Sequence, residues 1–180
     1  YAVMGSIYSQ TILHHKNPRV GLLCNGTEEG KGNKLTQAAF QLLSEAKNLN
    51  FIGNVEGHDL FSGAVDVVIC DGFVGNVVLK SCEQIAVALG HMVKQQIMQK
   101  LHWKIGALMA KGAFMELKRR TDYAEVGGAP LLGVAGVCII GHGISNAKAV
   151  RNGIRSAGDF VRLRVNETIA EHIKAMPNNS

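Results

Sequence analysis

The 180-residue sequence predicts an α/β fold built on a mostly parallel sheet. The apolar run 67–70 is too short to span a membrane and rich in β-branched residues, which is typical of a strand buried on both faces of such a sheet. Apolar runs also alternate with helical patterns, an order that favours parallel strands joined by right-handed crossovers. With 180 residues, of which 47% are hydrophobic, the chain is long enough to form one domain with its own core.

The first half of the chain supplies this alternation. A helix is expected over residues 2–14, ended by the polar segment before Pro18. Its start at Tyr1 has no capping residue, so we expect the sequence to be a segment of a longer protein. A strand is then expected over residues 19–24 and an amphipathic helix packed on the sheet over 34–45. A second strand over 49–54 and a short crossover over 59–63 lead to the buried strand over 66–70.

The second half is predicted to be largely helical. A helical pattern runs from Asn76 to about Arg120, too long for one ordinary helix, and we expect bends at three glycines, Gly90, Gly106 and Gly112. Residues 91–120 mix apolar and lysine positions and form a protruding helical element that could cover the sheet, pair with a second subunit or lie on a membrane. A Gly-rich connection, one further strand and a last basic helix are expected over residues 122–130, 131–140 and 147–174.

Composition narrows the classes of partner. Lys and Arg exceed Asp and Glu by 19 to 14, and this excess of +5 favours an anionic ligand, an acidic protein or a membrane surface. Aromatic residues make up 6% of the chain and do not alternate with the basic cluster 111–120, so no nucleic acid partner is expected.

The four cysteines have neither CxxC spacing nor a nearby histidine pair, so no metal site is expected. Cys70 and Cys138 lie in apolar runs and are predicted to be buried free thiols, which fits a reducing cytoplasm. The sequence shows no secretory signal and no continuous apolar stretch of about 18 residues, so we expect neither export nor a transmembrane span.

Three predicted strand ends, 25–33, 71–76 and 141–146, each pair glycines with an asparagine close to the start of a helix. Glycine lets backbone amides approach a ligand, and a helix N-terminus offers unpaired N–H groups. One such loop is more often a plain helix cap, but three together indicate an anion site. No Walker loop and no GxGxxG motif is present, so a small anion such as phosphate is expected and no nucleotide cofactor.

Two lysines are candidate cations at this site. Lys31 is flanked by glycines and could swing to a phosphate, although a solvated loop lysine is an equal alternative. Lys80 lies inside the helix that follows Asp71 and Gly72, and it could point back toward the same pocket or as easily pair with Glu83.

His142 could act as general acid or base or donate to an oxyanion, or it could be a structural histidine bonded to a loop carbonyl. Asp71 could orient a donor, or cap the following helix, which is the commoner role. Asn54 and Glu56 could line the pocket or merely close it. The other candidate phosphate or substrate contacts are Asn25, Gly30, Gly32, Asn33, Gly72, Gly75, Asn76, Gly143 and Asn146. No Ser-His-Asp pattern suggests a covalent acyl-enzyme.

With these residues in hand, the chain resembles the PlsX family, the phosphate acyltransferases of bacterial phospholipid synthesis. The resemblance covers nearly all 180 residues, and its motifs are YAVMGSIY, NPRVGLL, EEGKGN, NFIGNVEG, VDVVICDGFVGNVVLK, GGAPLLG and IGHGISN. They come in the family's order, with Tyr1 about midway along a family member. The resemblance therefore implies that residues 1–180 are a C-terminal portion.

The resemblance implies that inorganic phosphate attacks the thioester of an acyl-acyl-carrier protein, giving acyl phosphate. It also implies a Rossmann-like three-layer fold similar to isocitrate and isopropylmalate dehydrogenases, and a homodimer. Family members are soluble but touch the membrane, where they supply an integral glycerol-phosphate acyltransferase. Residues 91–114 resemble the membrane element, although a dimer-interface helix pair is the preferred interpretation.

This chain departs from the family pattern at Cys24, Asn25 and Thr27, beside the predicted site. Two other functions remain open: a phosphotransacetylase-like enzyme that uses coenzyme A, and a non-catalytic module for dimerisation and membrane docking.

Overall fold

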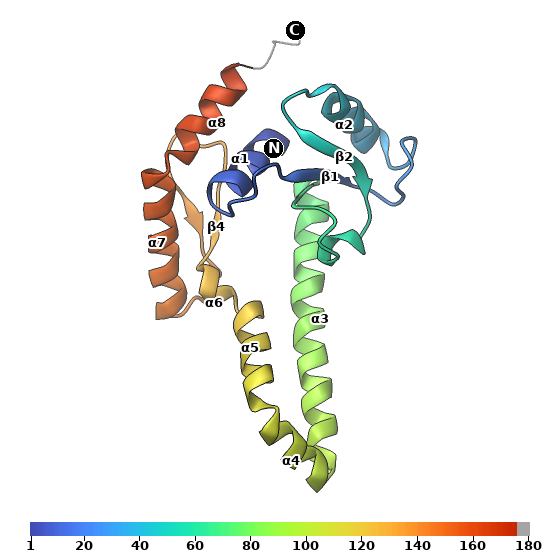
Figure 1. Cartoon of the computed structure of the whole chain (residues 1–180), viewed down its shortest axis with the longest axis vertical. Helices are drawn as coiled ribbons and strands as arrows, with labels where there is room; N and C mark the ends of the chain where they lie inside the picture. The colour runs from blue at the N-terminus through green and yellow to red at the C-terminus, as the bar shows by residue number, and fades with distance from the viewer. Residues whose placement is uncertain (176–180) are drawn as a thin grey trace.

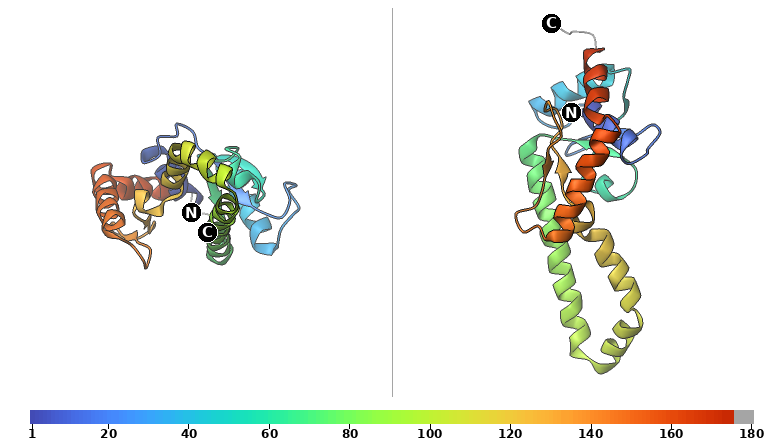
Figure 2. Two further views of the ribbon diagram at one scale, coloured as in Figure 1. Left: turned by 90° about the horizontal axis from the view of Figure 1, so that it is seen from below. Right: turned by 90° about the vertical axis from the view of Figure 1, so that its left-hand side faces the viewer.

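The computed structural model describes residues 1–175, except the side chain of Arg120. Figure 1 shows three parts: a small sheet with its helices, a long helical hairpin that projects away from it, and a second group of helices around a short β-ribbon. Figure 2 shows from the side that the hairpin extends well beyond the other two parts.

The sheet confirms the predicted parallel α/β arrangement. Strands β1 (Arg19–Leu23), β2 (Asn50–Val55) and β3 (Val67–Ile69) are parallel, in the order β2-β1-β3. The prediction that 66–70 is buried on both faces is wrong, because β3 has only β1 as a neighbour among the described residues and is half-buried. The central strand is β1, whose Val20 and Leu22 are fully buried.

The helices of the first half follow the prediction closely. Helix α1 spans Ala2–Thr11 and α2 spans Lys34–Glu45, and a short 3-10 turn, η1 (Asp59–Phe61), connects β2 to β3. The rings of Phe40 on α2 and Phe51 on β2 meet edge to face, 5.4 Å between centroids. Packing of α2 on the sheet is nevertheless partial, because Leu35 and Leu42 are each 61% exposed.

The hydrophobic core joins the two ends of the described chain. Val3, Met4 and Ile7 of α1 pack with Phe160 of α7 (Ala147–Arg162) and with Val165 and Ile169 of α8 (Val165–Lys174). The predicted last helix over 147–174 is therefore two helices. They are separated at Leu163 and Arg164, where Arg164 adopts a left-handed backbone conformation (φ 52°) that ends the α-helical path.

The hairpin consists of α3 (Gly72–Gln99), α4 (Leu101–Met109) and α5 (Lys111–Thr121). The predicted bends at Gly90, Gly106 and Gly112 are wrong, since the breaks fall at Lys100 and Ala110. A glycine inside a helix costs about 1 kcal/mol but removes no hydrogen bond, so the ladder continues through it. Helix α3 is long and apolar enough to cross a membrane, contrary to the expectation that no such stretch exists. An 18-residue stretch of it has a mean hydropathy of 1.2, and no part of that stretch is buried.

The remaining elements form the second group. Helix α6 (Tyr123–Val126) leads into β4 (Ala129–Pro130), which pairs antiparallel with β5 (Ile139–Ile140) in a separate two-stranded ribbon. The further strand expected over 131–140 therefore does not join the parallel sheet. Cys138 is exposed and Cys70 half-buried, so the prediction of two buried thiols is wrong for Cys138.

Candidate functional site

A hollow of about 530 Å³ lies where β1 and β3 end and where α2 and α3 begin. We call it the strand-end hollow, and its lining residues are Leu23, Cys24, Asn25, Gly32, Asn33, Thr36, Cys70, Asp71 and Val74. It brings together two of the three predicted strand ends, 25–33 and 71–76. Four of the predicted site residues line it: Asn25, Gly32, Asn33 and Asp71.

Strand pairing explains why these loops meet. Leu22 of β1 pairs with Ile69 of β3 in parallel, so both chains leave the sheet at the same edge. At the other end of the same pair, Arg19 and Asp66 form an ion pair with 2.9 Å between Nε and Oδ2. This ion pair fixes β1 against the start of β3, and sequence reasoning missed it because its partners are 47 residues apart.

Both helices that begin at the hollow are capped by a side chain that lines it. Oδ1 of Asn33 accepts the N–H of Thr36 at 2.9 Å. Oδ1 of Asp71 accepts the N–H groups of Phe73 and Val74, each at 2.9 Å. The capping role considered for Asp71 is thus the one that the structure gives it. Two helix N-termini, with their partial positive charge, adjoin one open space.

Loop 25–33 contributes backbone and one cation. Gly32 has φ +93°, and a Cβ there would collide with Oγ1 of Thr36 and lie 2.9 Å from the sulfur of Cys24, so only glycine fits. The stem of Lys31 covers Gly26, and Nζ of Lys31 has no hydrogen bond or ion pair within residues 1–175. Gly30 faces open space. The exposed Lys31 ammonium therefore remains available to an anion.

Cys70 adds a weakly polar wall to the hollow. Burial, and secondarily the charge of Asp71, raises the pKa of its thiol. A Cβ at Gly75 would lie only 3.1 Å from the Cys70 sulfur, so the glycine allows the start of α3 to approach this side chain. Because the thiol stays protonated at neutral pH, it adds no negative charge next to the helix N-termini.

Several predicted residues lie outside the hollow. Lys80 pairs with Glu83 (Nζ to Oε2, 3.0 Å), which was the alternative considered for it. The carboxylate of Glu56 lies 3.5 Å from the ring of His58. Gly72 and Asn76 belong to the first turns of α3 but do not line the hollow. Asn54 does not line the hollow but contacts loop 25–33, since its Nδ2 donates to the carbonyl of Glu28 at 2.9 Å.

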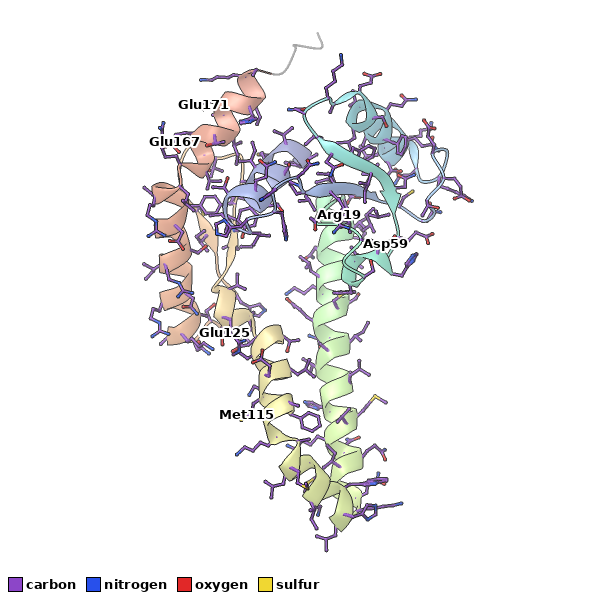
Figure 3. All side chains as sticks on the ribbon, viewed as in Figure 1. Arg19, Asp59, Met115, Glu125, Glu167 and Glu171 are labelled. Carbon is purple, nitrogen blue, oxygen red and sulfur yellow. The ribbon has the colours of Figure 1, made fainter. Side chains whose placement is uncertain are left out.

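The third predicted strand end, 141–146, lies with the second group. The ring of His142 packs against Tyr123 of α6 at 5.3 Å, and its Nδ1 accepts the N–H of Ile144. Asn146 caps α7 by accepting the N–H of Ala149, and Gly143 faces open space. Figure 3 shows Arg19 on β1, Asp59 in the turn η1 after β2, and Glu125 of α6 on the other side of the molecule. His142 and Gly143 are therefore not brought into the strand-end hollow.

No group of three or more His, Cys, Asp or Glu side chains in the part of the chain that the structure describes could hold a metal ion. The hollow offers the N-termini of two helices, which suit an anion, and Lys31 belongs to the loop beside it but does not line it.

Comparison with known proteins gives a consistent result. The family model described as "Fatty acid synthesis protein" matches residues 1–168. Among curated relatives, proteins named phosphate acyltransferase are 51% identical in Geotalea uraniireducens (174 residues, 97% of this chain and 50% of the relative) and 53% identical in Pelotomaculum thermopropionicum (176 residues, 98% and 51%). The one from Acidobacterium capsulatum is 52% identical over 169 residues, 94% of this chain and 50% of the relative. The chain spans about half the length of these relatives.

Proposed function

Since the chain belongs to the fatty acid synthesis protein family, we propose that residues 1–180 are the C-terminal portion of a phosphate acyltransferase. The enzyme would transfer a fatty acyl group from acyl-acyl-carrier protein to inorganic phosphate, giving acyl phosphate for phospholipid synthesis in the cytoplasm. The observation that carries this proposal is the strand-end hollow, where two helix N-termini meet the loop that bears Lys31.

The α2 end of the hollow suits phosphate better than the α3 end. Among the backbone N–H groups of the first turn, Oδ1 of Asn33 accepts only that of Thr36, and within the described residues the N–H groups of Lys34 and Leu35 have no partner. At α3, the Asp71 carboxylate already holds two N–H groups and would repel an anion. We therefore place phosphate near the start of α2, with Lys31 as its cation.

Phosphate itself is the nucleophile in this reaction. Its oxygen attacks the thioester carbonyl carbon, a C–O bond forms, and the carrier sulfur departs as the C–S bond breaks. Amides and Lys31 would orient the phosphate and offset the negative charge that develops, so no protein nucleophile is needed. His142 does not line the hollow, so its proposed role as the acid that protonates the departing sulfur requires the acyl donor to extend from the hollow to loop 141–146. In that role His142 would regain a proton from hydrogen phosphate through solvent.

The sheet supports a larger, Rossmann-like three-layer fold of the isocitrate dehydrogenase type. Within the described residues, β2 and β3 each pair only with β1, which leaves both outer edges of the sheet without a neighbouring strand. An edge strand presents unpaired N–H and C=O groups to which a further strand can be added. We propose that the remainder of the enzyme extends this sheet.

The hairpin is proposed to pair two copies of the chain. No residue of α3 or α4 is buried, and Leu101, Leu108 and Met109 are each more than 70% exposed. Met115 of α5 is also 61% exposed and is drawn on the outer side of the hairpin in Figure 3. Such exposed apolar helices are expected to bury their surface against a partner. Contact with the membrane, and with an integral glycerol-phosphate acyltransferase there, is the second use proposed for this element.

The test is phosphate-dependent release of free carrier protein from acyl-acyl-carrier protein by the full-length enzyme, with acyl phosphate trapped as the hydroxamate. Faster turnover with acyl-coenzyme A than with the carrier substrate would favour the phosphotransacetylase-like alternative. No turnover with either donor, together with flotation on liposomes that depends on Leu101, Trp103 and Leu108, would favour the non-catalytic docking module.

A further inference from the structure

Loop 25–33 carries the proposed phosphate site but has no regular secondary structure. Two side chains from neighbouring elements hold it. Nε2 of Gln37, on α2, donates to the carbonyl of Gly30 at 2.8 Å. Nδ2 of Asn54, on β2, donates to the carbonyl of Glu28 at 2.9 Å. The same Glu28 carbonyl accepts the N–H of Lys31 at 3.1 Å, so one oxygen joins the sheet, the loop and the residue that bears the cation.

Asn54 is an unexpected residue at its position. It pairs with Leu22 of the central strand and is 7% exposed, next to the buried Val55. Its Oδ1 is buried and has no hydrogen-bond partner within the described residues. The amide cannot simply be turned around, because the Glu28 carbonyl only accepts and must face Nδ2. A half-satisfied amide in this place destabilises the fold relative to an apolar side chain of the same size.

We propose that Asn54 is a positioning residue of the phosphate site, which ties loop 25–33 to β2 through Glu28 and thereby orders the loop that bears Lys31 beside the hollow. This inference rests on the proposed function. It assigns Asn54 no contact with phosphate, in keeping with its absence from the lining of the strand-end hollow. The destabilising amide is retained because a flexible loop would have to be ordered each time phosphate binds.

The test compares Asn54→Leu with Asn50→Leu in the full-length protein. Asn50 is a matched control, because its Nδ2 also donates from β2 to a loop carbonyl, that of Asn17, at the other end of the strand. Loss of one loop-ordering hydrogen bond should raise the KM for phosphate roughly three- to tenfold in Asn54→Leu. The KM for the acyl donor should be unchanged, and the melting temperature should be unchanged or higher. Asn50→Leu should leave the KM for phosphate unchanged.

Hydrogen exchange of loop 25–33 in the absence of substrate gives a second readout. The loop amides should exchange faster in Asn54→Leu than in wild type. In Asn50→Leu they should exchange at the wild-type rate. If Asn54→Leu does not fold, Asn54→Ala removes the same donor without adding bulk or a buried charge and is measured in its place. An unchanged phosphate KM or unchanged loop exchange in the folded variant would overturn the proposal. A wild-type protein without phosphate turnover would instead refute the proposed function, while the exchange comparison would still decide whether Asn54 orders the loop.

Discussion

Asp66 accepts three hydrogen bonds from Arg19: from Nε and from the backbone N–H to Oδ2, at 2.9 and 2.8 Å, and from NH2 to Oδ1 at 2.9 Å. These bonds hold the pKa of the Asp66 carboxyl well below its usual range, with the guanidinium hydrogen bond as the main cause. Since the pair joins the starts of β1 and β3, it fixes these two strands side by side, and the hollow lies at their opposite ends.

Asp66→Asn should therefore lower the melting temperature by roughly a few degrees at pH 7. A depressed folded-state pKa contributes stability that is complete above the unfolded pKa of about 4 and is lost as pH falls through the folded value. The difference between wild type and variant should thus shrink below about pH 4. Asp159→Asn, which removes an exposed ion pair with Arg162, is the control and should have little effect. Equal shifts for both variants, or a difference independent of pH, would refute this role.

Lys31→Ala should raise the KM for phosphate roughly 10- to 100-fold, because a charge-assisted hydrogen bond to the anion is lost. The KM for the acyl donor should stay the same. Lys47→Ala, an exposed lysine beyond the end of α2, should change neither value. If Lys31→Ala weakens phosphate and donor equally, Lys31 does not bind the phosphate.

His142→Asn should lower kcat by about 100-fold or more if the imidazole protonates the departing sulfur. The KM for phosphate should be unaffected, because His142 does not line the hollow. A kcat that stays at the wild-type level from pH 6 to 8 would leave His142 as a structural residue bonded to Ile144.

Leu101→Glu combined with Leu108→Glu should convert the proposed dimer to a monomer in sedimentation, because both leucines are more than 70% exposed on the hairpin. Leu35→Glu, at a leucine of α2 that is 61% exposed, serves as the control and should remain dimeric. A double variant that stays dimeric but no longer floats with liposomes would assign the hairpin to the membrane instead of the dimer.

The sequence predicted best those elements whose signals are local. Asn33 before an amphipathic stretch places the start of α2 at Lys34, as observed. The hairpin breaks at Lys100 and Ala110 carry neither proline nor glycine and depend on how the helices fold back. The burial of β3 could not be predicted either, because a β-rich apolar run does not say how many neighbouring strands it has.

The sequence predicted correctly those loops of the candidate site that follow parallel strands. Loops 25–33 and 71–76 follow parallel neighbours and meet, whereas loop 141–146 follows β5, which pairs antiparallel with β4 outside the sheet. The bond from Asn54 to Glu28 joins residues 26 apart in the chain and leaves no local pattern. Its signal in the sequence is a single polar residue in an otherwise apolar strand end.

The most direct test of phosphate as the nucleophile is to replace it with arsenate in the full-length enzyme. Acyl arsenate would hydrolyse at once, so we expect continuous release of free fatty acid and free carrier protein, at a rate that depends on arsenate and is suppressed by Lys31→Ala. Release of carrier protein at the same rate with no oxyanion present, or no release with arsenate while phosphate supports turnover, would contradict the account.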